Sequence, residues 1–216
     1  MSKYISLNMI QIAMAFLAFT MILSGCEEEM EEYAASINES GLIGGEKSSP
    51  LKHCVVESTV YSARDNKLLY EPEDDTPVCF RTFSKAIEFA TNGRVVLSED
   101  ATPETVTDEE INGPTVDQLG PAATFVVGIE YEHANFGGAT LTISSGVTCS
   151  GYTLSLSSMP SGWNDVISSA KAYSYCNHSL HYEHVNFNGA SIDCGTACSY
   201  VGAAMNDRTS SLKWWQ

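Results

Sequence analysis

One pattern of aromatic, glycine, acidic and hydroxyl residues occurs twice near the C-terminus of this 216-residue chain. The first copy contains EYEHANFGG and later WNDVISS, and the second contains HYEHVNFNG and later MNDRTSS. Internal repetition constrains a fold strongly, because each copy must form the same structural unit. The repeated pattern therefore predicts that the same structural unit forms twice.

The first shared element predicts a folded β-hairpin. Apolar residues alternate before and after it, which is the period of a half-buried strand. Glycine supplies the positive φ that a tight turn needs, and the two aromatic rings of each copy are spaced so that they can pack on one another. The positions shared by the copies are Tyr131, Phe136 and Gly138 in the first, and Tyr182, Phe187 and Gly189 in the second.

The second shared element is a loop rich in oxygen atoms, placed just before the last strand of each copy. It runs over Asn164–Ser169 in the first copy and over Asn206–Ser211 in the second. Short amide, carboxylate and hydroxyl side chains allow a sharp turn and present hard oxygen atoms, the ligands that calcium prefers.

Together these two elements resemble the βγ-crystallin family of the calcium-binding, microbial type. Both family motifs occur in both copies without a substitution, between about Thr124 and Gln216. The resemblance implies a mainly β fold, with a Greek key β-sandwich over residues 122–216 that consists of two keys, about 122–173 and 174–216.

The resemblance also implies two calcium sites, each with ligands from both copies. Glu132 and Glu183 would offer main-chain carbonyls, and so would Val166 and Arg208. The hydroxyls of Ser168 and Ser210 would serve their own sites, whereas the carboxylates of Asp165 and Asp207 would reach across to the other site. So few charged ligands indicate a dissociation constant of roughly 10⁻⁵ to 10⁻³ M. Arg208 would place a cation near one site and weaken it. The alternative is a crystallin scaffold that does not bind calcium.

The N-terminus predicts export and lipid attachment. Lys3 is followed by thirteen largely apolar residues over 10–22, which are too few for a comfortable membrane span and are typical of a secretory signal. The sequence Leu-Ser-Gly-Cys ending at Cys26 resembles a bacterial lipobox, which implies a signal peptide over 1–25 and acylation of Cys26; an ordinary signal peptide with a chance cysteine is the alternative. Residues 26–49 are expected to be a disordered, flexible tether. Their acidic start resembles signals for the outer membrane or the cell surface, or is solvated charge.

Charge and cysteine content narrow the function further. Residues 27–120 contain 21 acidic and 7 basic residues, and residues 121–216 contain 6 and 3, so nucleic acid is not an expected partner. Six cysteines remain beyond Cys26, an even number that predicts disulfides in an exported protein. Fifteen pairings are possible; Cys54 with Cys79 is the economical one, and Cys194 with Cys198 could pin a loop. A reduced, buried set is the alternative.

Residues 50–107 are expected to form a separate small α+β domain, followed by a linker over 108–121. One strand is predicted from Cys54, Val55, Val56 and Val60 and another at 94–97, and a helix over 82–90 has apolar residues on one face and Gly93 just past its end.

No catalytic motif is present, so an enzyme is not expected. His178, His181 and His184 suggest zinc, but on a strand the middle residue faces the other way. The sequence predicts a calcium-binding, lipid-anchored envelope protein with a structural or adhesive role. The alternative is an inhibitor of secreted proteases, or another protein-binding module, that uses the loop between Cys194 and Cys198.

Overall fold

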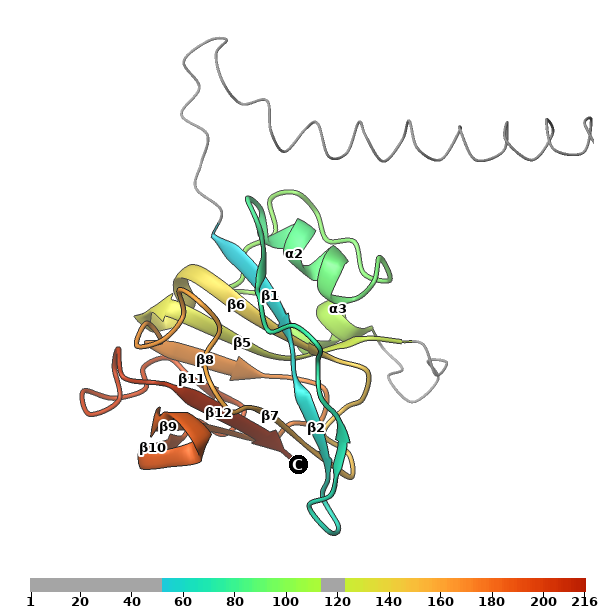
Figure 1. Ribbon diagram of the computed structural model, residues 1–216. Coiled ribbons are helices and arrows are strands. Elements are labelled where there is room, and N and C mark those ends of the chain that lie inside the picture. The colour runs from blue at the N-terminus through green and yellow to red at the C-terminus, as the bar shows by residue number, and fades with distance from the viewer. Residues whose placement is uncertain (1–51, 114–122) are drawn as a thin grey trace, which may run out of the picture. The chain divides into compact units, whose positions relative to one another are not determined.

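Two six-stranded sheets packed face to face make up the body of the protein (Figure 1). The computed structural model describes residues 52–113 and 123–216, all of which belong to one compact unit, Ser49–Gln216. The expected signal peptide, Cys26 and the tether over 26–49 lie outside the described residues. Within the described ranges, no helix has the length and apolar character needed to cross a membrane.

The first sheet has the strand order β11-β8-β5-β6-β1-β4, and the second has the order β10-β9-β12-β7-β2-β3. The strands of the region before the repeat are β1 (His53–Glu57), β2 (Thr59–Ser62), β3 (Leu68–Tyr70) and β4 (Val78–Phe80). Those of the repeat are β5 (Phe125–His133), β6 (Gly137–Ser145), β7 (Tyr152–Leu156), β8 (Ser169–Ala172), β9 (His178–His184), β10 (Asn188–Asp193), β11 (Ala197–Cys198) and β12 (Ser211–Trp215).

The two copies of the repeat exchange strands. Strands β5 to β8 come from the first copy and β9 to β12 from the second, yet β7 pairs with β12 in the second sheet and β11 pairs with β8 in the first. Each copy thus gives its third strand to the sheet that holds the rest of the other copy. The mainly β fold and the Greek key sandwich are confirmed, and each sheet contains strands of both copies.

Each folded hairpin is closed by the aromatic pair that the sequence predicts. The ring centroids of Tyr131 and Phe136 lie 5.5 Å apart at an interplanar angle of 65°, and the corresponding pair in the second copy lies 5.7 Å apart at 66°. Gly138 has a φ of +83°, and a Cβ atom there would lie 2.9 Å from the ring of His133. Gly189 and His184 repeat this contact at 2.9 Å. The glycine is therefore required twice over, by backbone conformation and by the histidine ring against it.

The region before the repeat is not a separate domain in this structure. Strand β1 pairs in parallel with β6, and β2 pairs antiparallel with β7, so both sheets of the sandwich are extended by it. Only Ser58 lies between β1 and β2, so one nearly continuous segment crosses from one sheet to the other. Val56 packs into the core between the sheets, whereas Val55 packs into the core on the outer face of the first sheet.

Helix α2 (Phe83–Ala90) confirms the predicted helix and covers the outer face of the first sheet (Figure 1). Phe83, Ala86, Ile87 and Ala90 are buried, which are the four positions of the predicted apolar face. The strand predicted at 94–97 is wrong, because that segment has no strand. Its Arg94 side chain turns inward instead and donates hydrogen bonds to main-chain carbonyls of Asn112 and Thr124, at 2.7 and 2.9 Å.

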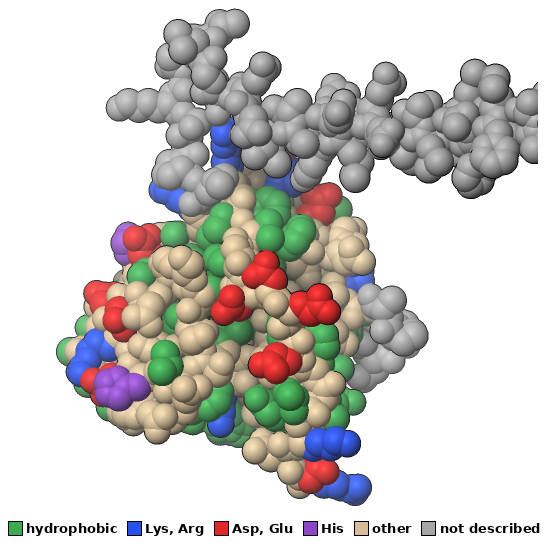
Figure 2. Space-filling model, viewed as in Figure 1, with side chains coloured by type: hydrophobic (Ala, Val, Ile, Leu, Met, Phe, Trp, Pro, Cys, Tyr) green, Lys and Arg blue, Asp and Glu red, His purple; other side chains and the backbone are tan. Residues whose placement is uncertain are grey.

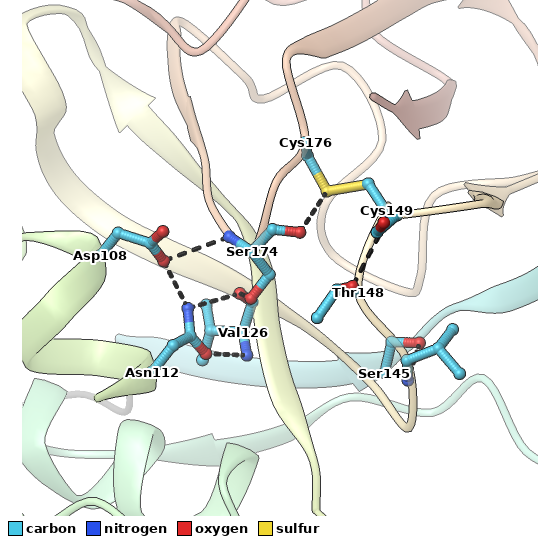
Figure 3. The surroundings of a disulfide bond; sticks show 10 residues. Asp108, Asn112, Val126, Ser145, Thr148, Cys149, Ser174 and Cys176 are labelled. Carbon is cyan, nitrogen blue, oxygen red and sulfur yellow. Dashed lines mark hydrogen bonds between the residues drawn. A yellow bond between two sulfur atoms is a disulfide. The ribbon is translucent and has the colours of Figure 1, made fainter. Parts of the chain in front are cut away.

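The segment expected to be a linker begins with a docked helix, α3 (Asp108–Asn112). Thr107 and Glu110 form a reciprocal capping box at its start. Asn112 exchanges two hydrogen bonds with the main chain of Val126, at 3.0 and 3.1 Å, and Asp108 accepts one from the main-chain N–H of Ser174 at 3.1 Å (Figure 3). The side chains of α3 therefore satisfy main-chain groups of β5 and of the turn between the two keys.

Three disulfides join the six cysteines of the described residues. Cys54–Cys79 and Cys194–Cys198 confirm the two predicted pairs. The third, Cys149–Cys176, lies beside the turn that α3 contacts (Figure 3).

Candidate functional site

The two oxygen-rich loops lie against each other in a reciprocal arrangement. The N–H of Asp165 donates to the carbonyl of Thr209 at 3.1 Å, and the N–H of Asp207 donates to the carbonyl of Ile167 at 3.1 Å. Both aspartates adopt positive φ, 59° and 55°, a conformation that Asp tolerates better than most residues. The repeated sequence thus produces a local pseudo-two-fold pair of loops.

This pairing brings the hydroxyl of each loop next to the carboxylate of the other. Ser168 Oγ donates to Asp207 Oδ1 at 3.4 Å, and Ser210 Oγ donates to Asp165 Oδ1 at 3.4 Å. We call Ser168 with Asp207 the first oxygen group, and Ser210 with Asp165 the second oxygen group. Each carboxylate therefore lies beside the hydroxyl of the other loop.

Each folded hairpin lies at the side of one oxygen group. The N–H of Ser168 donates to the carbonyl of Tyr131 at 2.9 Å, and the N–H of Ser210 donates to the carbonyl of Tyr182 at 2.8 Å. Glu132 is therefore the next residue along the chain beside the first oxygen group, and Glu183 occupies the same place beside the second.

The side chains of these two glutamates have a structural contact of their own. Glu132 accepts a hydrogen bond from the N–H of Ala139 at 3.0 Å, and Glu183 accepts one from the N–H of Ala190 at 3.2 Å. One carboxylate oxygen of each is thus engaged by the second strand of its hairpin.

The last serine of each loop has a role that the sequence did not reveal. Ser169 Oγ donates to the carbonyl of His133 at 2.6 Å and accepts from the N–H of Phe136 at 3.0 Å. Ser211 Oγ does the same with His184, at 2.7 Å, and Phe187, at 3.0 Å. These hydroxyls fasten the bent tip of each hairpin to the loop beside it. The only signal in the sequence was that the position repeats.

The two halves differ at the first spacer position of the loop. Val166 is half-buried and packs on the core, whereas the guanidinium of Arg208 forms an ion pair with the Glu183 carboxylate and donates to the carbonyl of Ala204 at 3.1 Å. The Ala190 amide, with a further contribution from Arg208, lowers the pKa of Glu183. On the first half, Glu132 has no Lys or Arg partner among the described residues; its neighbour is His133 Nε2 at 3.9 Å.

The donor set fits a hard cation better than zinc. Among residues 52–113 and 123–216, no group of three His, Cys, Asp or Glu side chains is placed to hold a metal ion. Each oxygen group instead supplies one carboxylate and one hydroxyl beside main-chain carbonyls, which is oxygen chemistry suited to calcium. The histidines that suggested zinc have separate surroundings. Nδ1 of His178 lies 2.6 Å from Oδ2 of Asp193 and its ring stacks on Trp215. His181 is buried, and the ring of His184 lies against Gly189.

A buried acid and base lie in the core, apart from the loop residues named above. Glu130 and His181 are both 0% exposed, and Glu130 Oε2 is 3.7 Å from His181 Nε2. Burial raises the pKa of Glu130 well above its usual range and lowers the pKa of His181 to about 4. Glu130 is the only charged residue in the stretch Phe125–Tyr131 of β5, which is the one signal of it in the sequence.

The repeated hairpins, the exchanged strands and the paired loops can be compared with those of solved structures. The C-terminal part of this chain is similar to βγ-crystallin domains. A βγ-crystallin from an archaeon is 27% identical over 41% of this chain and 96% of its own, with a TM-score of 0.32. A βγ-crystallin domain from Clostridium beijerinckii is 25% identical over 41% of this chain and 97% of its own, also with a TM-score of 0.32.

A double mutant of clostrillin, solved in complex with nickel, is 25% identical over 42% of this chain and 98% of its own, with a TM-score of 0.32. No protein-family model and no curated protein sequence matches the chain. Each of these matches covers 41–42% of this chain.

Proposed function

We propose that this protein binds two calcium ions between its paired loops and acts as a non-enzymatic, lipid-anchored protein of the bacterial envelope. The observation that carries the proposal is the reciprocal placement of Ser168 beside Asp207 and of Ser210 beside Asp165, at 3.4 Å each. Hard oxygen donors from two different chain segments, brought together by the fold, are what a calcium ion needs.

A bound calcium ion would attract the oxygen ligands of both Greek keys and so hold the two loops together. The first oxygen group would hold one ion with carbonyls of the first hairpin and loop, and the second oxygen group would hold the other in the same manner. Because each group needs both loops in place, the ions would bind the folded chain and not the unfolded one. Binding would therefore stabilise the fold, by about 2.7 kcal/mol for one site when free calcium is a hundredfold above the dissociation constant.

The proposed location rests on the N-terminal sequence. Acylation of Cys26 after removal of residues 1–25 would anchor the chain in the bilayer, and residues 26–49 would connect it to the crystallin-like unit. An envelope or surface position would expose the loops to calcium concentrations that fill weak sites. Metabolic labelling with a radioactive fatty acid tests this step: the native protein should be labelled and Cys26→Ala should not, whereas equal labelling would contradict it.

Because the chain is acidic, nucleic acid is not proposed as a partner. Figure 2 shows acidic side chains scattered among apolar and uncharged ones on the viewed face, with basic side chains near its edges. A surface of this kind offers a polyphosphate no continuous basic track on that face.

The calcium proposal is tested by calorimetric titration of the calcium-free protein. Two bound ions are expected, with Ser168→Ala and Ser210→Ala each reducing the number to one. Ser150→Ala removes an exposed hydroxyl outside the two loops and should bind like the native protein. The absence of binding heat, together with an unchanged melting temperature in millimolar calcium, would refute the proposal.

A protein-binding role is favoured by one further observation. The Cys194–Cys198 disulfide closes a short loop that contains β11, an edge strand of the first sheet, with exposed residues at 196 and 197. An exposed edge strand is a place where a partner chain can add. Incubation with a panel of secreted proteases separates the two roles, because tight one-to-one inhibition would favour an inhibitor over a structural protein.

A further inference from the structure

The two oxygen groups match in backbone geometry but differ in charge. The first contains the Asp207 carboxylate, and Glu132 follows the Tyr131 carbonyl that its Ser168 contacts; neither acid forms an ion pair with Lys or Arg among the described residues. The second contains the Asp165 carboxylate, and Glu183, which follows the Tyr182 carbonyl that its Ser210 contacts, pairs with the guanidinium of Arg208. Counting these side chains, the first carries two negative charges, and the second carries two negative charges and one positive.

We infer that the two calcium sites are unequal, with the first oxygen group binding calcium more tightly because Arg208 is a fixed competing cation at the second. This inference rests on the proposed function and adds to it an order of filling. It also assigns to the side chain of Arg208 a regulatory role, although only its main-chain carbonyl would be a ligand.

The position of Arg208 is held by two contacts rather than one. Its guanidinium pairs with Glu183 on the hairpin and donates to the carbonyl of Ala204 just before the loop. These two contacts hold the partly exposed guanidinium against the second hairpin and the start of its loop, on the side of the second oxygen group. The same ion pair also neutralises the glutamate that, on the first half, adds a negative charge near the ion.

Coulomb's law gives the size of the effect. One unit of charge at about 8 Å from a divalent ion, in a medium close to water, changes the binding free energy enough to alter the dissociation constant by roughly five- to tenfold. The effect is that of a partly exposed charge, so salt should reduce it. The first site would then fill at lower calcium concentration, and the second only as the concentration rises further.

The pseudo-symmetry of the loops supplies the variants. The native protein should show two calorimetric steps that differ by about five- to tenfold; Ser168→Ala should abolish the tighter step and Ser210→Ala the weaker. Arg208→Gln removes the charge and should bring the two dissociation constants to within about twofold, whereas Arg208→Lys should keep most of the difference. Raising potassium chloride from 0.05 to 0.5 M should bring the two dissociation constants of the native protein closer together, because salt screens the charge of Arg208. The ratio of the two constants in Arg208→Gln should stay nearly the same.

The reverse exchange is the matched control. Val166→Arg, combined with Arg208→Val, should make the first site the weaker one, and the melting temperature without calcium shows whether this variant still folds. Equal affinities in the native protein, or a gap that survives Arg208→Gln, would overturn the inference. A complete lack of calcium binding in the native protein would instead refute the proposed function, so the two failures are distinguishable.

Discussion

The replacement Glu130→Gln should change how the stability of the protein depends on pH. Glu130 is fully buried on β5, and neither of its carboxylate oxygens has a hydrogen-bond partner among the described residues. Its Oε2 atom lies 3.7 Å from Nε2 of His181. Burial raises the pKa of Glu130 well above its value in an unfolded chain, so the carboxyl group is protonated in the folded protein at pH values where the unfolded chain has lost that proton.

The sign follows from the number of protons in each state. A raised pKa in the folded state gives stability that is complete below the unfolded pKa, near 4.5, and is lost as the pH rises. The loss is about 1.4 kcal/mol for each pH unit above the unfolded pKa over which Glu130 stays protonated in the folded protein. His181 acts in the opposite direction: burial lowers its pKa from 6.5 to about 4, so its contribution is lost as the pH falls through that window. Because His181 is present in both proteins, the difference between them isolates Glu130.

Urea unfolding of the calcium-free protein, followed by tryptophan fluorescence at pH 5, 6, 7 and 8 with disulfides intact, measures this difference. The free energy of unfolding of the native protein minus that of Glu130→Gln should fall as the pH rises from 5, by up to about 1.4 kcal/mol per pH unit. Glu132→Gln, at a side chain 43% exposed, is the matched control for replacing a carboxyl group with an amide. A difference between the native protein and Glu130→Gln that stays within about 0.5 kcal/mol across this range would refute the reasoning, because a buried neutral acid cannot give a flat profile.

Three further outcomes test the packing. Ser169→Ala and Ser211→Ala should each lower the free energy of unfolding by about 1–3 kcal/mol in denaturant melts, since each leaves a hairpin amide and carbonyl without a partner; an effect below 0.5 kcal/mol would contradict the clamp. Gly128→Ala should lower the free energy of unfolding by about 1–3 kcal/mol in the same assay, because its Cβ would lie 2.8 Å from Trp214 Nε1. A variant as stable as the native protein would show that the two sheets can move apart at this position without loss of stability. The fragment 122–216 should be less stable than the full chain by at least about 5 kcal/mol, since it lacks the buried valines of β1 and β2, each worth roughly 1.5–3 kcal/mol; equal urea midpoints would restore the two-domain interpretation.

Several features were predictable because they depend on neighbouring residues. The folded hairpins follow from the spacing of Tyr131, Phe136 and Gly138, and helix α2 follows from four apolar positions on one face. The Cys54–Cys79 bridge followed from economy of pairing, and it joins two strands that lie side by side in the first sheet. In each case the information lies within a few residues or in a short list of pairings.

Other features depend on which distant segments meet. The alternation around Val55 predicts a strand but not its partner, and β1 lies along β6, whose sequence is about 90 residues away. The segment 94–97 has three apolar residues after Arg94 and the composition of a strand. Arg94 instead donates hydrogen bonds to carbonyls of α3 and of the segment before β5, and no strand forms there.

By itself, the sequence determined that two similar units form, that each has a bent hairpin and an oxygen-rich loop, and which residue types those loops present. Only the tertiary structure decided that Ser168 lies beside Asp207, that Arg208 pairs with Glu183, and that β1 and β2 complete both sheets. The physical reason is range: turn geometry and hydrophobic period act over a few residues, whereas strand pairing and the meeting of charges depend on how the whole chain closes.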